Sequence, residues 1–200
     1  MKTMLFCLSL LVSLPLLAQP AGKGVFGLPA QPNTFSYDYV EVGLLHMDRH
    51  NLNGLRSSGS FTVMHNLSVI GSLTAAMRSD AEQQALTAGV AYHQKLHGTV
   101  LQATDFILHA ELEAQRIKLE RRFLRDRTET HAGVVVGAGL RNRLIDDVEV
   151  FADFSVRTTG STDPFVTLGG RFSVLPELQL QASLEVGDND TFLTGVRYSF

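Results

Sequence analysis

The chain has a single cysteine, Cys7, and it lies close to the N-terminus. No apolar run beyond the N-terminal region approaches the ~20 residues that a membrane-spanning helix needs. A chain that crosses a bilayer without such helices must do so as a closed β-barrel. If cleavage of an N-terminal segment removes Cys7, the remaining chain can form no disulfide and has no thiol chemistry. An exported form of this chain must then be stabilised in another way.

Lysine is also scarce. Of the 17 basic residues, only Lys2, Lys23, Lys95 and Lys118 are lysine, and the others are arginine. The formal net charge of −3 argues against general nucleic-acid binding. The arginine excess favours pairing with carboxylates in a confined space, because a guanidinium offers a rigid fork of donors that lysine lacks.

The N-terminus has the organisation of a secretory signal. Lys2 supplies the charge, residues 5–17 supply an apolar stretch, and Leu16-Leu17-Ala18 is a suitable cleavage site. We therefore predict a cleaved signal peptide over residues 1–18. Residues 19–34 are rich in glycine, proline and small polar residues, which predicts a flexible lead-in. Residues 35–200 then form the only folded domain.

The remaining chain alternates between apolar and polar residues every second position, which is typical of β-strands with two different faces. In residues 178–187, for example, Leu180, Leu184 and Val186 share one face, and Gln181 and Glu185 share the other. Ten segments show this pattern: 36–45, 57–65, 67–78, 84–93, 104–115, 131–141, 147–158, 164–174, 178–187 and 192–200. The sequence predicts an all-β fold, an antiparallel up-and-down transmembrane barrel of ten strands. If the two weak opening segments merge, the number is eight.

Alternation alone leaves the direction of the apolar face open, because soluble carrier barrels keep their apolar face inside. Here the polar face is rich in glycine, serine and threonine and carries charges of both signs with almost no lysine, which suits a crowded lumen. Tyr92, Tyr198 and Phe200 lie near strand ends, as the aromatic girdles of membrane barrels do. We therefore expect the apolar face to contact lipid.

With this orientation the lumen receives charges that nearly cancel. Unpaired charges in a confined lumen are costly, so we predict an ion-pair network across the barrel. Its members are Glu41, Arg78, Glu111, Glu113, Arg141, Glu149, Asp153, Arg157, Arg171, Glu185 and Arg197. Such a network serves either as an ion path or as a plug that fills the interior, and arginine on many strands favours the plug.

The chain ends with Gly195-x-x-Tyr198-x-Phe200, which resembles the C-terminal assembly signal of bacterial outer-membrane proteins. Leu193 stands where that signal usually has a polar residue. With its signal peptide and strand pattern, the mature chain resembles the small OmpA-like outer-membrane barrels. The resemblance implies assembly through the Bam machinery, and we expect a monomer in a Gram-negative outer membrane. It includes no motif for a substrate.

The sequence offers little support for catalysis or a cofactor. Outer-membrane lipid hydrolases typically carry a His-x-Ser element, and none of the seven histidines has serine two residues later. His46 and Asp48 resemble a protease pair, but such spacing arises readily by chance. His109, Glu111 and Glu113 lie side by side about 7 Å apart along a strand, which favours a hydrogen-bond network with arginines over a metal site. We therefore expect no enzyme and no cofactor.

A basic segment over residues 116–127 is predicted at a strand extension and loop. It could bind lipopolysaccharide phosphates or be an ordinary solvated loop. Its basic residues are Arg116, Lys118, Arg121, Arg122, Arg125 and Arg127. The predicted role is therefore a non-enzymatic barrel with a structural or surface-interaction function, with a narrow pore and a soluble periplasmic barrel for an apolar ligand as alternatives.

Overall fold

The computed structural model describes residues 35–48, 51–96, 103–119 and 127–200. None of these residues belongs to a helix that could cross a membrane. The predicted signal peptide and the lead-in over 19–34 lie outside the described residues.

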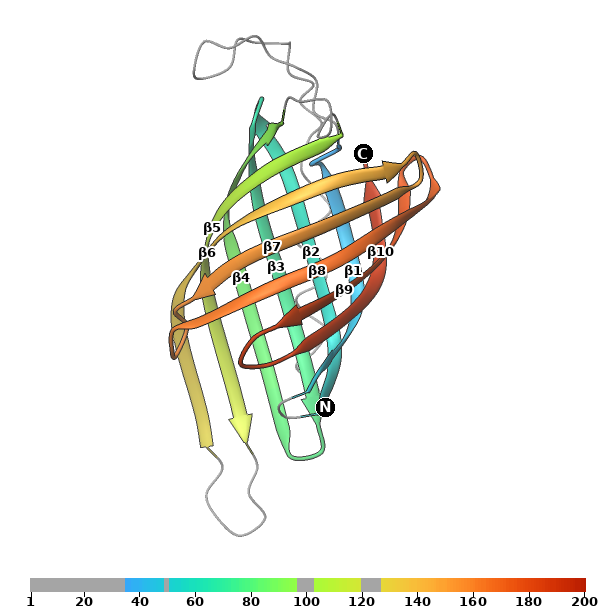
Figure 1. Ribbon diagram of the computed structural model, residues 1–200. Helices are drawn as coiled ribbons and strands as arrows, with labels where there is room; N and C mark the ends of the chain where they lie inside the picture. The colour runs from blue at the N-terminus through green and yellow to red at the C-terminus, as the bar shows by residue number, and fades with distance from the viewer. Residues whose placement is uncertain (1–34, 49–50, 97–102, 120–126) are drawn as a thin grey trace. The chain divides into compact units, whose positions relative to one another are not determined.

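The ten predicted strands form one closed antiparallel barrel, so the eight-strand alternative is wrong (Figure 1). Each strand pairs with its neighbours in sequence, and β1 closes the barrel by pairing with β10. The strands are β1 (Tyr39–Met47), β2 (Leu52–Met64), β3 (Leu67–Arg78), β4 (Ala81–Lys95), β5 (Thr104–Leu119), β6 (Arg127–Ile145), β7 (Val148–Arg157), β8 (Asp163–Leu175), β9 (Leu178–Val186) and β10 (Thr191–Ser199).

The two ends of the barrel differ in their connections. One end, which we call the turn end, holds the short turns at 65–66, 146–147 and 176–177, the connection 96–103, and Phe200. The opposite loop end holds the connections 48–51, 79–80, 120–126, 158–162 and 187–190. Bacterial membrane barrels place short turns in the periplasm and loops outside the cell, so this asymmetry suggests which end faces outward.

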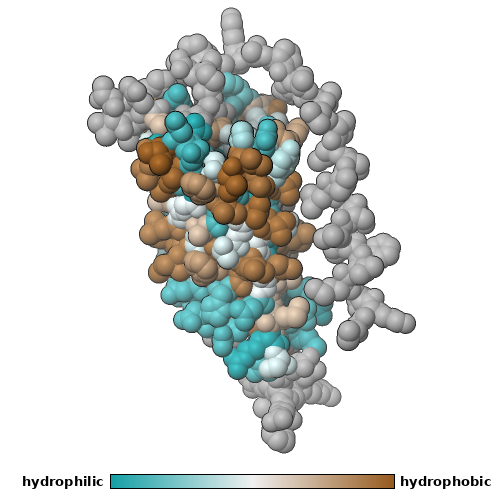
Figure 2. Space-filling model, turned by 90° about the vertical axis from the view of Figure 1, so that its right-hand side faces the viewer, coloured by the Kyte–Doolittle hydropathy of each residue, from teal (hydrophilic) through white to brown (hydrophobic). Residues whose placement is uncertain are grey.

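The outer face of the barrel is apolar. Leu112, Leu44 and Phe154 are 70%, 63% and 56% exposed, although aliphatic and aromatic side chains of a soluble protein are usually buried. On the face that Figure 2 shows, apolar surface forms a band with hydrophilic surface on both sides of it. The lumen-facing residues of the same strands include Glu41, Glu113 and Ser155, all buried. This arrangement is that of a transmembrane barrel; a soluble carrier barrel would need the reverse.

The strands on one side extend further at the loop end than those on the other (Figure 1). β6 pairs with β5 from Arg127 onward, but its pairing with β7 begins only at Val135. Thr128 and Thr130 on this extension are exposed and polar, in contrast to the exposed Val134 and Val136 nearer the barrel centre. The extension therefore lies beyond the apolar band, in an aqueous or headgroup environment. We call residues 127–133 of β6 the free edge.

Candidate functional site: the barrel lumen

The lumen wall is joined across the β1–β10 seam by a buried ion pair. Glu41 and Arg197 are direct partners in the register of these strands. The Arg197 guanidinium donates to Glu41 through Nη2 and Nε at 2.9 and 3.0 Å, and Gln181 donates to the other carboxylate oxygen at 2.9 Å. Arg197 also stacks on the Tyr39 ring at 3.5 Å. Both charges are therefore satisfied inside the barrel, as buried charges must be.

A second cluster lies nearer the turn end. Arg141 donates from Nε to Glu149 at 2.9 Å, and both side chains are only 4% exposed. Gln179 donates to the same carboxylate at 3.1 Å. Arg171 lies 3.9 Å from Glu149, donates to Gln181 at 2.6 Å and stacks on Phe151 at 4.2 Å. The guanidinium planes thus use aromatic rings as well as carboxylates as partners.

The segment preceding β1 folds into the lumen at this end. Phe35 and Tyr37 are 4% and 7% exposed, and Arg141 lies over the Phe35 ring at 4.2 Å. The Tyr37 ring stacks on His93 with centroids 3.7 Å apart, and its hydroxyl donates to Asp105 at 2.9 Å. Burial raises the pKa of the Tyr37 phenol, and the negative charge of Asp105 raises it further. These contacts fix residues 35–37 across the inside of the barrel.

A histidine cluster occupies the middle of the lumen wall. His109 Nδ1 lies 3.1 Å from Glu111, and its Nε2 lies 3.2 Å from both Asp153 and the hydroxyl of Ser155. The glycine between these strands, Gly137, makes the contact possible, because a Cβ there would overlap Ser155 and His109.

This cluster brings together histidine, aspartate and serine, the three residue types of a serine hydrolase. No His-x-Ser motif marks it, because His109 lies on β5 whereas Asp153 and Ser155 lie on β7. Ser155 is 1% exposed, and the Nε2 that would act as its base is shared with the Asp153 carboxylate. A base must be free to take the serine proton. The arrangement therefore fits a hydrogen-bond network, in which the partners of His109 are Glu111, Asp153 and Ser155 and not the arginines that we predicted.

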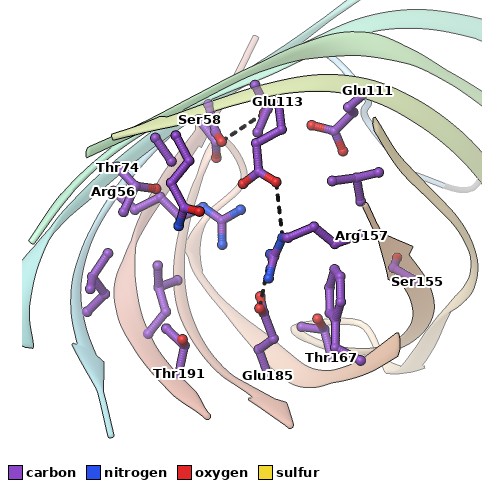
Figure 3. Close-up of a pocket in the computed structure, with 18 of the residues that line it drawn as sticks. Arg56, Ser58, Thr74, Glu111, Glu113, Ser155, Arg157, Thr167, Glu185 and Thr191 are labelled. Atoms are coloured by element: carbon purple, nitrogen blue, oxygen red, sulfur yellow. Dashed lines mark hydrogen bonds and ion pairs between the residues drawn. The ribbon is translucent and has the colours of Figure 1, made fainter. Parts of the chain in front are cut away.

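Towards the loop end, the lumen widens into a cavity of about 660 Å³ that reaches Gly160 and Asn189 at the rim. Arg157 crosses it, with its Nε 3.1 Å from Glu113 and its Nη2 3.2 Å from Glu185 (Figure 3). Thr159 also donates to Glu113, at 2.6 Å. One wall of this cavity is apolar, formed by part of a small buried cluster of Leu45, Met47, Leu52, Ala76 and Leu193.

The remaining predicted site residues lie elsewhere. Arg78 ends β3 on the same face as the buried Ala76, but it is exposed at the loop-end rim and pairs with Asp80 of the following turn at 3.4 Å. Arg116 and Lys118 lie on the part of β5 that pairs with the free edge of β6, which we call the β5 extension, and Arg127 begins β6. Arg121, Arg122 and Arg125 lie outside the described residues. At the C-terminus, Tyr198 and Phe200 are exposed and their rings lie 6.4 Å apart, whereas Gly195 lies where a Cβ would overlap the backbone of Val42.

Several lumen residues were not among the predicted site residues. Tyr37, His93 and Asp105 form the turn-end contacts, and Arg56 reaches into the loop-end cavity from β2 (Figure 3). Period-2 alternation could have placed Arg56 and Asp105 on the polar face. Nothing in the pattern marks residues 35–37, because they precede the first strand. Within the described parts of the chain, no three histidine, cysteine or acidic side chains are arranged to hold a metal ion.

No family model and no curated protein matches this chain. Among solved structures it is similar to a KdgM porin, at 11% identity and a TM-score of 0.48, covering 81% of this chain and 99% of that one. Ail, the attachment invasion locus protein of Yersinia pestis, has 11% identity and a TM-score of 0.45, covering 81% and 95%. Neisserial surface protein A has 16% identity and a TM-score of 0.44, covering 82% and 98%.

Proposed function

We propose that the chain is a monomeric, non-enzymatic outer-membrane protein with a plugged lumen and a structural or surface-interaction role. The observation that carries the plug is the position of Phe35 and Tyr37, which lie across the turn end on Arg141 and His93. The Arg141–Glu149 and Glu41–Arg197 pairs line the lumen wall between adjacent strands. A steady ion path through the turn end would have to displace Phe35 and Tyr37.

The exposed contacts of the barrel follow from the same orientation. Tyr198 and Phe200 face outward at the turn end, where the Bam machinery would recognise a terminal aromatic strand. Arg116 and Lys118 lie on the β5 extension, at a level suited to lipopolysaccharide phosphates if the loop end faces outside the cell.

Planar-bilayer recording tests the plug, and cell fractionation tests the location. We expect recovery in the outer membrane and a bilayer that stays electrically silent after the purified protein is inserted. Steady conductance steps would overturn the plug and favour a narrow pore, for which the loop-end cavity would be the vestibule. Recovery in the soluble periplasmic fraction would overturn the outer-membrane assignment itself.

A further inference from the structure

Within the described parts of the chain, no strand pairs with the side of the free edge that faces away from β5. β7 pairs with β6 as far as Val135 and Arg157. Beyond that pair, the backbone N–H of Thr158 donates to the Val134 carbonyl and the Thr158 hydroxyl accepts from the Val134 N–H, both at 2.9 Å. The chain then turns over the inner side of Gly133, where a Cβ would lie 2.6 Å from the backbone nitrogen of Thr159. Beyond Gly133, no residue that the structure describes pairs with the backbone on this side of β6.

The Val134 contacts show which backbone groups point outward. In an antiparallel strand, residues two apart direct their N–H and C=O groups to the same side. Thr128, Thr130 and Ala132 therefore present theirs on the side away from β5. No described residue forms a backbone hydrogen bond with the N–H or C=O groups of these three residues on that side. The seven residues of the edge span about 24 Å at 3.4 Å each, enough for a typical strand of ~5–6 residues.

We propose that this free edge is a docking site for an extended segment of another polypeptide, which would add an eleventh strand beside β6. This inference deepens the surface-interaction role proposed above and rests on it. An open edge is a ready template for strand addition, in which main-chain hydrogen bonds supply affinity and alternate side chains supply specificity. Soluble proteins usually shorten or cover such edges, whereas β6 extends this one beyond the strand that should protect it.

The neighbouring charge indicates what kind of segment fits. On the outer face, Arg116 and Lys118 of β5 are the direct register partners of Thr130 and Thr128. A strand added to β6 would place its own outward side chains one strand beyond these threonines, within reach of Arg116, whereas Lys118 also faces Glu82 of β4 on its other side. Thr128 and Thr130 also offer a β-branched surface against which the outward side chains of the added strand can pack. The fitting partner is therefore a β-strand with acidic residues at its outward, alternate positions.

Two other occupants fit less well. A second copy in the same membrane points its β6 in the same sense relative to the bilayer, so two free edges cannot lie antiparallel to each other. Phe35, the first described residue, contacts Arg141 and Arg143 at the turn end, whereas the free edge lies at the opposite, loop end. Neither restriction applies to a separate polypeptide.

The test uses the full-length mature protein in detergent without lipopolysaccharide and three capped heptapeptides. The first alternates valine and glutamate, the second alternates valine and lysine, and the third is the glutamate peptide N-methylated at alternate residues so that it cannot bond to an edge. We expect the glutamate peptide alone to slow hydrogen exchange at the Thr128, Thr130 and Ala132 amides at least tenfold. Equal protection by the N-methylated peptide, or none by the glutamate peptide, would overturn the proposal.

Variants separate the edge from general charge. Thr130→Pro removes an outward donor and should abolish protection at Thr128 and Ala132, while Thr130→Ser, the matched control, should keep it. Arg116→Glu should weaken binding of the glutamate peptide about two- to fivefold, as expected for an exposed ion pair, and favour the lysine peptide. Unchanged binding in Thr130→Pro, with the barrel still folded by heat-modifiable gel migration, would contradict edge docking. Failure of this test leaves the plug and the location untouched, because those depend on conductance and fractionation.

Discussion

Arg141 shows at the scale of one residue how this barrel keeps charge inside a bilayer. Its guanidinium donates to Glu149, lies over the Phe35 ring and donates to the Ser36 carbonyl at 3.3 Å. Removing one partner of a buried pair leaves the other charge uncompensated in a medium of low dielectric. The pair is thus costly to break, whatever it contributes when intact.

Replacing Glu149 with glutamine should therefore lower the free energy of unfolding by about 3–5 kcal/mol. The control is Asp80→Asn, which breaks the exposed Arg78–Asp80 pair and should cost at most about 1 kcal/mol, since water screens it. Urea titration of the protein in phospholipid vesicles measures both. Equal costs for the two variants would mean that water reaches the Arg141–Glu149 pair.

Gly137 gives a second prediction at this scale. A methyl group there would overlap the Ser155 hydroxyl and His109 Nε2, so Gly137→Ala should displace the histidine cluster and destabilise the barrel by about 1–3 kcal/mol. At Gly170 the nearest atom to an added Cβ is the Glu149 carbonyl oxygen at 3.4 Å, an ordinary contact. Gly170→Ala should leave the urea midpoint nearly unchanged, and a similar loss in both variants would show that the effect is general to strand glycines.

The sequence predicts that a residue faces the lumen where that residue belongs to a strand, but it does not do so for residues 35–37, which precede β1. Alternation alone places Glu41 and Arg197 on the polar face, and the structure makes them direct partners. It does not reveal that Asp153 and Ser155 meet His109, because the contact depends on the relative register of three strands. Pair identities are thus set by register, which one sequence does not contain.

At the scale of elements, the strands were largely predictable and their ends were not. The predicted 67–78 coincides with β3, and 178–187 nearly coincides with β9. The predicted 131–141 is much shorter than β6, Arg127–Ile145, because apolar alternation marks only the part of a strand that touches lipid. Residues 127–130 pair with β5 beyond the apolar band, where polar side chains on both faces hide the period.

Residues 35–37, which lie inside the barrel before β1, support a prediction about conductance. A double variant, Phe35→Ala with Tyr37→Ala, removes the rings that contact Arg141 and His93 and should give small, discrete current steps in a planar bilayer that is silent with the parent protein. The matched control replaces two outward aromatics, Phe154→Ala with Phe172→Ala, and should remain silent. If the Phe35→Ala, Tyr37→Ala variant is also silent, the barrier to ions is formed by the lumen arginines Arg141, Arg171 and Arg197 instead.

At the scale of the whole molecule, the decisive property is that the usual distribution of polarity is inverted. Val42, Leu44 and Leu184 face outward with 53%, 63% and 43% exposure, while Glu41 and Arg197 are enclosed. In water such a surface would cost about 25 cal/mol for each Å² of exposed apolar area, and in a bilayer this cost disappears. The closed ladder also pairs the strand backbones, which hydrocarbon requires. Barrel closure and membrane insertion are therefore mutually dependent.

The chain has no tryptophan, so a single introduced tryptophan can report which face touches lipid. Leu168 lies on the outer face of β8 and is 51% exposed, whereas the adjacent Thr167 lines the loop-end cavity. In vesicles containing lipids brominated along their acyl chains, Leu168→Trp fluorescence should be strongly quenched. Thr167→Trp should keep most of its intensity, because the barrel wall separates it from the bromine atoms. If Thr167→Trp were the more strongly quenched variant, the assignment of inner and outer faces would be reversed, and with it the membrane-spanning barrel itself.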